Sequence, residues 1–583
     1  MTRAPVQIAA VRAARAGAKA VGELAEHPDT PEAENGLPPG CPVLPLGKFG
    51  EFRFYLDADK QLVALPAEKH GRLNLLGLFG AHRTLPYEYW PRMDKDGATV
   101  GWRPELAAEE MMAACSRKGI WDPAERERGR GAWRGPHGEL ILHVGNQVQI
   151  YPAGPDPWTH RQILAPGVLD RYVYPAGETA GLAADVPGME PAQTVLDALG
   201  SWEWRRGELD AVLLLGWIGA AMIGGALDWR PVVWVTGSKG TGKSTLQERL
   251  RLLFDDTLVQ LADTSEAYVR QRLRHQTLPV LVDELEAEED NRRAMGVVKL
   301  ARIAASGGRI GRGGADHQGV EFTLRSAFMF SSILVPPLLG QDRSRIAILD
   351  LKELTAGAQM PLVADETWRQ LGAQLRRRMV DGWPRWRTTL EWYRGRLQQG
   401  GHTARGADQF GTLLAAADLL LYSNAPERDM DGWVDKLSAR TTAEVEEDVS
   451  DQDRCLQHLL TQSVDPYRNG GRKSVAEWVR QAAGKTVGAD VREANGALGT
   501  YGLHVDLKLK VLVVADYHQG LAALYAQSQW QSRSGAVGVW VQALRRLPGA
   551  ERARKVYWFA GAVGRGTALP LDVVVPDMPF DME

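Results

Sequence analysis

Cysteine is scarce in this sequence. The three cysteines, Cys41, Cys115 and Cys455, lie far apart in the chain, and none forms a Cys-x-x-Cys pair. This spacing provides no zinc signature, and it favours a reducing compartment over a disulfide-stabilised secreted protein. The first residues also contain no secretory apolar segment. We therefore expect a cytoplasmic protein.

Long apolar runs and a large net charge are lacking as well. The longest apolar run, 211–226, contains several glycines and is too short to span a bilayer comfortably, so it predicts a buried helix and no membrane partner. The formal net charge of the chain is −3. Because its charges are so nearly balanced, the chain as a whole is unsuited to coating a polyanion, and any nucleic-acid-binding surface must be local.

A glycine-rich segment that follows an apolar run is the most informative part of the sequence. Residues 232–235 are apolar, and the G-x-x-x-x-G-K-[ST] spacing begins at Gly237 and leads into a helix-compatible stretch. Glycines allow backbone N–H groups to converge on a phosphate at a helix N-terminus, so this order predicts a phosphate-binding loop. We expect Lys243 to contact the β- and γ-phosphates of ATP and Ser244 to ligate Mg²⁺. The predicted nucleotide-binding residues are Gly237, Ser238, Lys239, Gly240, Thr241, Gly242, Lys243, Ser244 and Thr245.

A second apolar run, 277–282, ends in the acidic pair Asp283 and Glu284. This is the pattern of a Walker B strand, in which Asp283 holds the Mg²⁺ shell and Glu284 polarises the attacking water. The pattern favours ATP hydrolysis over phosphoryl transfer to another substrate. The acidic residues that follow are expected to lie on a solvated helix face; they are Glu286, Glu288, Glu289 and Asp290.

Strands and helices alternate around these two motifs. The segment 291–306 predicts a helix, 307–319 a glycine-rich basic excursion, and 326–333 and 346–350 two further buried strands. Such alternation around a phosphate loop indicates a parallel α/β sheet. We therefore predict an α/β fold with a P-loop NTPase core.

Changes in composition divide the rest of the chain. Arginines and tryptophans alternate between 368 and 392, which predicts either helices that bury a Trp stripe with Arg outside or a surface that stacks on bases. The predicted segments are an N-terminal helix and linker at 1–45, a mostly β domain at 46–190, the P-loop ATPase core at 191–355, a helical domain at 356–462 and a winged-helix-like α/β domain at 463–583.

The motifs together resemble a known group. The phosphate loop, the LVDE pair, the basic glycine-rich segment and the run PPLLGQDRSR at 336–345 are similar to those of the helicase-like ATPases of phages, prophages and mobile elements. These ATPases are related to the AAA+ superfamily-three helicases. The runs GGALDWRP at 224–231 and RSAFMFSS at 325–332 resemble that group too. The resemblance covers roughly 195–420 and leaves the N-terminal part unassigned.

The resemblance implies a homo-hexameric ring with ATP between neighbouring subunits. A hairpin at about 309–321 would line a central pore and grip single-stranded or forked DNA. The DNA contacts implied by the resemblance are Arg309, Arg312 and His317.

The resemblance also implies residues that sense or activate ATP. Arg343 or Arg345 would be an arginine finger that reaches the ATP of the adjacent subunit. Arg405 would sense the ATP of its own subunit. A superfamily-three sensor strand typically ends in Asn, whereas this one ends in Ser331 and Ser332, and we expect the Ser332 hydroxyl to contact the nucleotide.

The leading functional prediction is an ATP-dependent DNA helicase or translocase that serves replication of a phage or mobile element, with possible replication partner proteins. An origin-binding or helicase-loading ATPase without processive unwinding is an alternative. A primase–helicase fusion and a defence or signalling NTPase are further alternatives. The basic hairpin favours a DNA-handling protein. The pair at Asp57 and Asp59 predicts a turn, and no further carboxylate motif follows it, which disfavours a primase.

Overall fold

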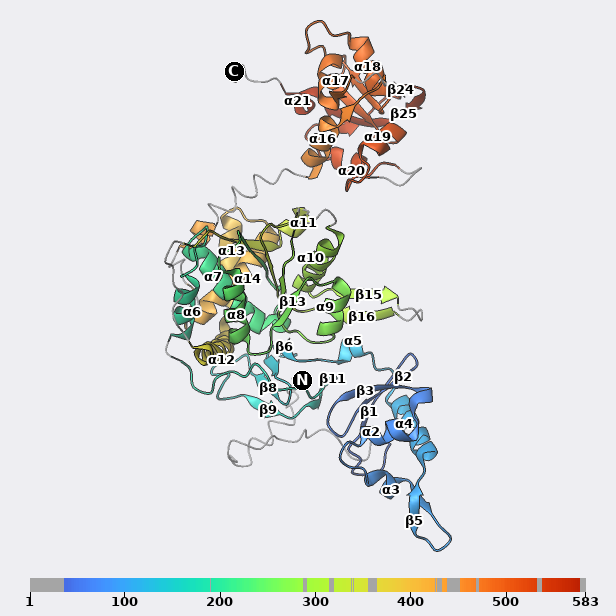
Figure 1. Ribbon diagram of the computed structural model, residues 1–583, viewed down its shortest axis with the longest axis vertical. Helices are drawn as coiled ribbons and strands as arrows, with labels where there is room; N and C mark the ends of the chain where they lie inside the picture. The colour runs from blue at the N-terminus through green and yellow to red at the C-terminus, as the bar shows by residue number, and fades with distance from the viewer. Residues whose placement is uncertain are drawn as a thin grey trace, which may run out of the picture. The chain divides into compact units, whose positions relative to one another are not determined.

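The computed structural model describes residues 36–188, 190–286, 291–313, 319–336, 338, 340–354, 364–424, 426, 432–437, 451–467, 471–531 and 537–576. The chain divides into two compact units, 1–442 and 443–583, each with a hydrophobic core of its own (Figure 1). Within the described ranges, no helix combines the length and the apolar character needed to cross a membrane.

A five-stranded parallel sheet forms the centre of the first unit. Its strand order is β13-β14-β17-β12-β18, and every neighbouring pair is parallel. The strands are β12 (Val232–Gly237), β13 (Val259–Ala262), β14 (Val280–Asp283), β17 (Phe328–Ser332) and β18 (Ile346–Leu351). The predicted parallel α/β sheet is confirmed, and β13 is a strand that the sequence analysis missed.

Helices cover both faces of this sheet. They have to, because successive apolar side chains of β12 point to opposite faces and both sets need a core. Val233 and Val235 point into one core and Val232 and Trp234 into the other. The first core contains residues of α6 (Pro191–Leu199), α7 (Glu208–Met222), α8 (Lys243–Phe254), α12 (Asp365–Gly382), α13 (Trp386–Gln399) and α14 (Ala404–Leu421). The second core contains residues of α9 (Glu266–Leu273) and α10 (Arg292–Ala305).

The apolar run at 211–226 is a buried helix, as predicted. It forms most of α7, which is buried on all sides between the sheet and α14, and the short η2 (Gly224–Ala226). The Trp217 indole N–H donates to the carbonyl of Phe328 in β17 at 3.1 Å. A helix without a polar face is stable here because protein surrounds it on every side.

Residues 36–188 form small antiparallel sheets and short helices. The three-stranded sheet consists of β1 (Leu44–Phe49), β2 (Phe52–Leu56) and β3 (Leu62–Pro66), and the four-stranded sheet of β6 (Gly131–Arg134), β7 (Leu140–His143), β8 (Val148–Tyr151) and β9 (Gln162–Leu164). Two ribbons are β4 (Pro91–Met93) with β5 (Thr99–Trp102) and β10 (Gly167–Leu169) with β11 (Tyr172–Tyr174). The helices are η1 (Ala67–Lys69), α2 (Arg72–Leu78), α3 (Leu85–Tyr89), α4 (Pro104–Lys118) and α5 (Pro123–Arg126).

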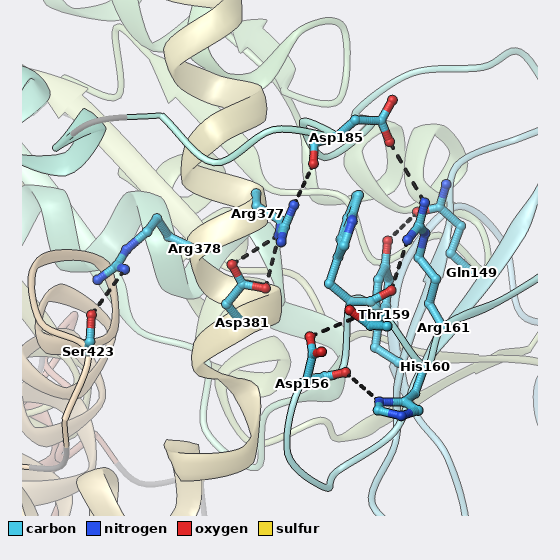
Figure 2. A network of polar contacts seen from close by, with 12 residues as sticks. Gln149, Asp156, Thr159, His160, Arg161, Asp185, Arg377, Arg378, Asp381 and Ser423 are labelled. Carbon is cyan, nitrogen blue, oxygen red and sulfur yellow. Dashed lines mark hydrogen bonds and ion pairs between the residues drawn. The ribbon is translucent and has the colours of Figure 1, made fainter. Parts of the chain in front are cut away.

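A polar and aromatic network joins the segment after β8 to α12 (Figure 2). The Trp158 ring lies between the guanidinium groups of Arg161 and Arg377, each 4.0 Å from a ring centroid. Arg377 also pairs with Asp381 at 2.9 Å and donates to the carbonyl of Asp185 at 2.6 Å. The four-stranded sheet shares its hydrophobic core with α7 and α12, so this network reinforces a packed contact.

Several of the tryptophans and arginines between 368 and 392 pack inside the first unit. Trp368, Trp383 and Trp386 are buried, which confirms the predicted Trp stripe. The expected outward position is found for Arg387, which is exposed, and is wrong at Arg376, Arg377 and Arg385. Arg376 is buried and donates to a backbone carbonyl at the end of α8, and Arg385, in η3 (Trp383–Arg385), forms an ion pair with a buried aspartate of α14.

The second unit is a mixed α/β domain around a four-stranded antiparallel sheet of order β21-β22-β26-β23. The helices are α16 (Asp451–Thr461), α17 (Val475–Ala482), α18 (Val491–Gly499), α19 (Gln519–Leu524), α20 (Trp540–Leu544) and α21 (Leu571–Val574). The strands are β19 (Ser463–Val464), β20 (Lys473–Ser474), β21 (Leu503–Asp506), β22 (Val511–Ala515), β23 (Glu551–Arg552), β24 (Tyr557–Phe559), β25 (Ala562–Gly564) and β26 (Gly566–Pro570). Its winged-helix-like character stays a prediction.

Candidate nucleotide-binding site

The glycine-rich segment connects β12, which lies between β17 and β18 in the sheet, to α8. β12 ends at Gly237 and α8 begins at Lys243, so the strand, loop and helix occur in the predicted order. Gly240 and Gly242 have φ values of +87° and +85°, a region that residues with a Cβ rarely adopt. The loop backbone therefore depends on glycine at these two positions. Phosphate binding by this loop stays a prediction.

Lys243 folds back over the loop. Its ammonium group donates to the carbonyl of Gly237 and, at 3.0 Å, to that of Ser238. Burial lowers the pKa of Lys243, while the negative charges of Glu286 and Asp283 act in the opposite direction. These three charged groups therefore lie within electrostatic reach of one another at one edge of the sheet.

Trp202 packs against the glycine-rich loop and is hydrogen-bonded to it. Its indole N–H donates to the carbonyl of Gly242 at 3.1 Å. A Cβ added to Gly242 would lie 2.8 Å from the indole nitrogen. Close contact with Trp202 thus adds a second reason for glycine at this position, beside the backbone conformation. Ser244 and Thr245 are exposed in the first turn of α8.

Gln247 links the acidic strand to the helix that follows the loop. The Gln247 amide donates to the Asp283 carboxylate at 2.7 Å and to the Ser331 hydroxyl at 3.0 Å. The strands β12, β14 and β17 are parallel, so their carboxyl ends meet at the same edge, and this is where ligands bind in open α/β sheets. The sequence analysis did not single out Gln247, although it lies one helical turn after Lys243 and therefore on the same helix face.

The predicted contact between Ser332 and the nucleotide does not fit the structure. Successive side chains of a strand point to opposite faces, and the Ser332 hydroxyl accepts a hydrogen bond from the Trp234 indole at 2.8 Å, in the core on the other face. Ser331 is the serine that faces Gln247 and, through it, Asp283. Ser331, and not Ser332, therefore lies on the face of the sheet that carries Gln247 and Asp283.

Glu284 and Glu286 follow β14 and have different surroundings. Glu284 is exposed, and its φ of +55° turns the chain out of the strand. The Glu286 carboxylate accepts hydrogen bonds from the backbone N–H groups of Ile333 at 2.6 Å and Leu334 at 3.1 Å. The prediction that Glu286 lies on a solvated helix face is therefore wrong, because the carboxylate holds the end of β17. Glu288, Glu289 and Asp290 lie outside the described residues.

The two candidate finger arginines lie at the opposite edge of the sheet. Arg343 ends α11 (Gly340–Arg343) and is exposed, and Arg345 directly precedes β18. Ile346 pairs with Val232 at the amino end of β12. A strand rises about 3.3 Å per residue, so this edge is roughly 17 Å from the phosphate loop of the same chain.

The two carboxylates that lie near these arginines in the sequence each form an ion pair with another arginine. Asp342 pairs with Arg302 at 2.7 Å, and Asp350 pairs with Arg205 at 2.6 Å. Neither of these ion pairs involves Arg343, which is exposed.

Arg405 lies near Arg345 and not near the phosphate loop. Burial lowers the pKa of Arg345, and the positive charge of Arg405 lowers it further. Gln409, one turn after Arg405 in α14, donates to the carbonyl of Val232 at 2.7 Å. Both contacts place Arg405 at the amino edge of the sheet, so the predicted role as a sensor of the same subunit's ATP does not fit this structure.

The basic excursion forms an antiparallel hairpin. Its strands are β15 (Arg309–Gly313) and β16 (Gly319–Thr323), with Arg309 opposite Thr323 and Arg312 opposite Val320. His317 lies outside the described residues. DNA binding by this hairpin stays a prediction.

The donor set at the carboxyl edge fits magnesium better than a transition metal. Among the described residues, no group of three or more His, Cys, Asp and Glu side chains could hold a metal ion by itself. The oxygens of Ser244 and Asp283 are the hard ligands that Mg²⁺ prefers when substrate phosphates complete its coordination. These two residues therefore stay the candidate ligands.

No protein-family model matches, and no curated protein matches. Two solved structures of the C-terminal region of NrS-1 in its apo form align with this chain, at 12% and 11% identity, covering 90% and 91% of this chain and 95% and 96% of theirs. The TM-score is 0.33 in both cases, which is too low to support a shared fold.

Proposed function

We propose that this protein is an ATP-dependent DNA helicase or translocase of a phage or mobile element. The observation that carries the proposal is the contact of Gln247 with Asp283 and Ser331 beside Lys243, at the edge where β12, β14 and β17 end. A glycine loop, a lysine and a carboxylate brought together in this way supply the parts that hydrolysis of a nucleoside triphosphate requires.

Each side chain has a defined task in the proposed reaction. The Lys243 ammonium would leave the loop carbonyls and neutralise charge on the β- and γ-phosphates. Ser244 and Asp283 would hold Mg²⁺, which neutralises the charge that develops on the phosphate oxygens. Glu284 would orient the attacking water, and its exposure beyond the strand end leaves its carboxylate accessible to that water.

The prediction for hydrolysis separates binding from turnover. Lys243→Ala should weaken both ATP binding and hydrolysis. Glu284→Gln should keep ATP binding and lower the turnover rate by about 10²–10³-fold, because a neutral amide cannot accept the proton of the water. Nucleotide binding is measured by titration calorimetry and turnover by phosphate release. Glu366→Gln on α12, which changes an exposed carboxylate, serves as the matched control.

Turnover of Glu284→Gln within about threefold of the unchanged protein would remove Glu284 as the water-orienting residue.

An unwinding assay on a forked DNA duplex distinguishes a helicase from an origin-binding or helicase-loading ATPase that does not unwind processively. Strand separation that requires ATP, together with DNA-stimulated hydrolysis, would support the helicase. Stimulated hydrolysis without strand separation would favour the origin-binding or helicase-loading ATPase.

A further inference from the structure

A polar pocket of about 330 Å³ lies in the first unit, apart from the phosphate loop. It is lined by α5, β6, the turn before β11, the loop before β14 and residues at both ends of the β15–β16 hairpin. Figure 1 shows α5 beside this hairpin, and α5 contacts β16. His275 and Arg325 precede β14 and β17, so the pocket lies at the amino edge of the sheet.

Positive charge dominates the pocket. Its lining includes five arginines, Arg126, Arg128, Arg134, Arg171 and Arg325, and the described carboxylates in the lining are Glu125 and Glu127. Burial raises the pKa of Glu127 to about 7, so near neutral pH this carboxyl carries only part of its negative charge. Burial lowers the pKa of its neighbour His275 to about 4, so that ring is neutral under the same conditions.

Neutral groups accept the hydrogen bonds of two of these arginines. Arg128 donates to the Tyr174 hydroxyl at 2.8 Å, and Arg171 donates to the Tyr172 hydroxyl at 2.9 Å. Neutral acceptors orient a guanidinium group without cancelling its charge. Burial alone would raise the pKa of Tyr172, but the hydrogen bond from Arg171 and the charge of Arg128 lower it, as expected in a positive field.

The remaining positive charges are crowded. The pKa of Arg325 is lowered by burial and then by the positive charge of Arg128. Arg134 pairs with Asp228 at 3.5 Å, but the Asp228 side chain is 84% exposed, so water screens this contact strongly. The carboxylates near Arg128 and Arg325 are therefore weak counter-charges, because Asp228 is exposed and Glu127 carries only part of its negative charge near neutral pH.

Backbone hydrogen bonds hold the arginine-bearing segment in place. The Arg128 N–H donates to the carbonyl of Val173 at 2.8 Å, and the Thr277 N–H donates to the carbonyl of Arg130 at 2.9 Å. The Arg128 guanidinium lies 3.4 Å from the Tyr172 ring centroid. The segment is thus fixed between β11 and the loop before β14, and the charges are positioned before any ligand arrives.

We propose that this pocket binds a phosphate group of a nucleotide, carried either by a DNA strand beside the hairpin or by a free nucleotide. A phosphate would relieve the repulsion among the arginines, and the planar guanidinium fork matches phosphate oxygens. Trp133 and Tyr172, in the same lining, hold the Arg128 guanidinium group by cation–π contacts at 5.2 Å and 3.4 Å from their ring centroids. The proposal depends on the proposed function in one respect, because that function is the reason to expect that the nucleic acid is DNA.

Binding to a fluorescein-labelled oligothymidylate, measured by anisotropy without ATP, tests the proposal. Arg171→Ala and Arg325→Gln should each weaken binding about three- to tenfold and lower the slope of log affinity against log salt by about one, because each removes one phosphate contact. Arg171 is exposed, so its replacement leaves the fold intact even if the change at half-buried Arg325 does not. Arg369→Ala on α12 is the matched control and should change neither quantity.

A second probe distinguishes the source of the phosphate. AMP is titrated calorimetrically into a Lys243→Ala background, in which the phosphate loop is disabled. If Arg171→Ala abolishes AMP binding and leaves oligothymidylate binding unchanged, the pocket takes a free nucleotide. If Arg171→Ala changes the affinity for neither AMP nor oligothymidylate, and the circular dichroism spectrum is retained, the proposal is overturned. Neither measurement involves hydrolysis, so failure of the pocket and failure of the proposed ATPase are seen separately.

Discussion

Gln247 is a single amide that contacts two strands of the sheet. It is 3% exposed, and its Nε2 group donates to both Asp283 and Ser331. A buried acceptor that loses its donor costs about 1–3 kcal/mol, and more when it is charged. In this structure the position of the Asp283 carboxylate therefore depends on Gln247, although glutamine belongs to neither sequence motif.

Replacement of Gln247 should slow hydrolysis more than it weakens nucleotide binding. Gln247→Met keeps the volume of the side chain but removes the donor, so Asp283 loses its fixed orientation. We expect the turnover rate to fall about tenfold and the dissociation constant for ATP to change by less than about threefold. Phosphate release and calorimetry measure the two quantities.

The control is Gln260→Met, because Gln260 is exposed and donates to the side-chain amide oxygen of Gln247 at 3.4 Å, on the side of that amide away from its Nε2 donor. Equal losses of turnover in both variants would show that the orientation of Asp283 does not depend on Gln247.

Two glycines of the loop between β12 and α8 have different surroundings, and this difference can be tested. Gly240 and Gly242 share a positive φ, but only Gly242 lies against Trp202, and a Cβ on Gly240 would meet no heavy atom within 4 Å. Backbone strain alone costs about 1–2 kcal/mol for a residue with a Cβ. A contact of 2.8 Å adds a steric cost at Gly242 and forces the loop or the indole to move.

Gly242→Ala should therefore weaken ATP binding by about tenfold or more, and Gly240→Ala by a smaller factor. Calorimetry with ATP measures both variants, and thermal unfolding shows whether each one is folded. The opposite order of the two affinities would mean that the contact with Trp202 does not determine the loop conformation.

Among helices and strands, the sequence predicts the long and strongly patterned ones well. The strand–loop–helix around Gly237 and the basic hairpin both occur where the sequence places them. The strand Val259–Ala262 was missed because it is short and only Val259 among its residues is buried. The side of the strand to which Ser331 or Ser332 points depends on the register with β12, which a serine pair alone does not reveal.

The first unit is built from segments that are distant in the sequence. Ala132, Leu140 and Tyr151 pack in the same core as α7 and α12, so the four-stranded sheet of the N-terminal part and the parallel sheet share one hydrophobic interior. Changes in composition along a chain report loops and linkers, but they carry no information about which segments share a core. The position of Arg405 could not be predicted from sequence for a similar reason, because it depends on how α14 packs.

Mixing two inactive variants tests the arginine at the scale of the assembly. Arg343→Ala and Lys243→Ala should each be inactive alone, and in mixed rings some interfaces would combine an intact phosphate loop with an intact arginine. We expect ATP hydrolysis to return partly at intermediate mixing ratios. The control mixes Lys243→Ala with Glu284→Gln, which damage the same side of every site and should restore nothing.

If mixed rings form and no ratio restores hydrolysis, Arg343 does not act across an interface, and the same test then applies to Arg345.

The opposed edges of the parallel sheet have a consequence for symmetry. The loop at Gly237 and the arginine at Arg343 lie at opposite ends of the strands, so one copy offers them in different directions. A two-fold dimer could bring the loop and the arginine together only if one patch contained both edges, whereas a heterologous, head-to-tail contact joins opposite edges directly. A series of copies joined by such contacts either closes into a ring or grows into a filament. In a closed assembly every loop faces an arginine, whereas an open one leaves a terminal loop without its partner.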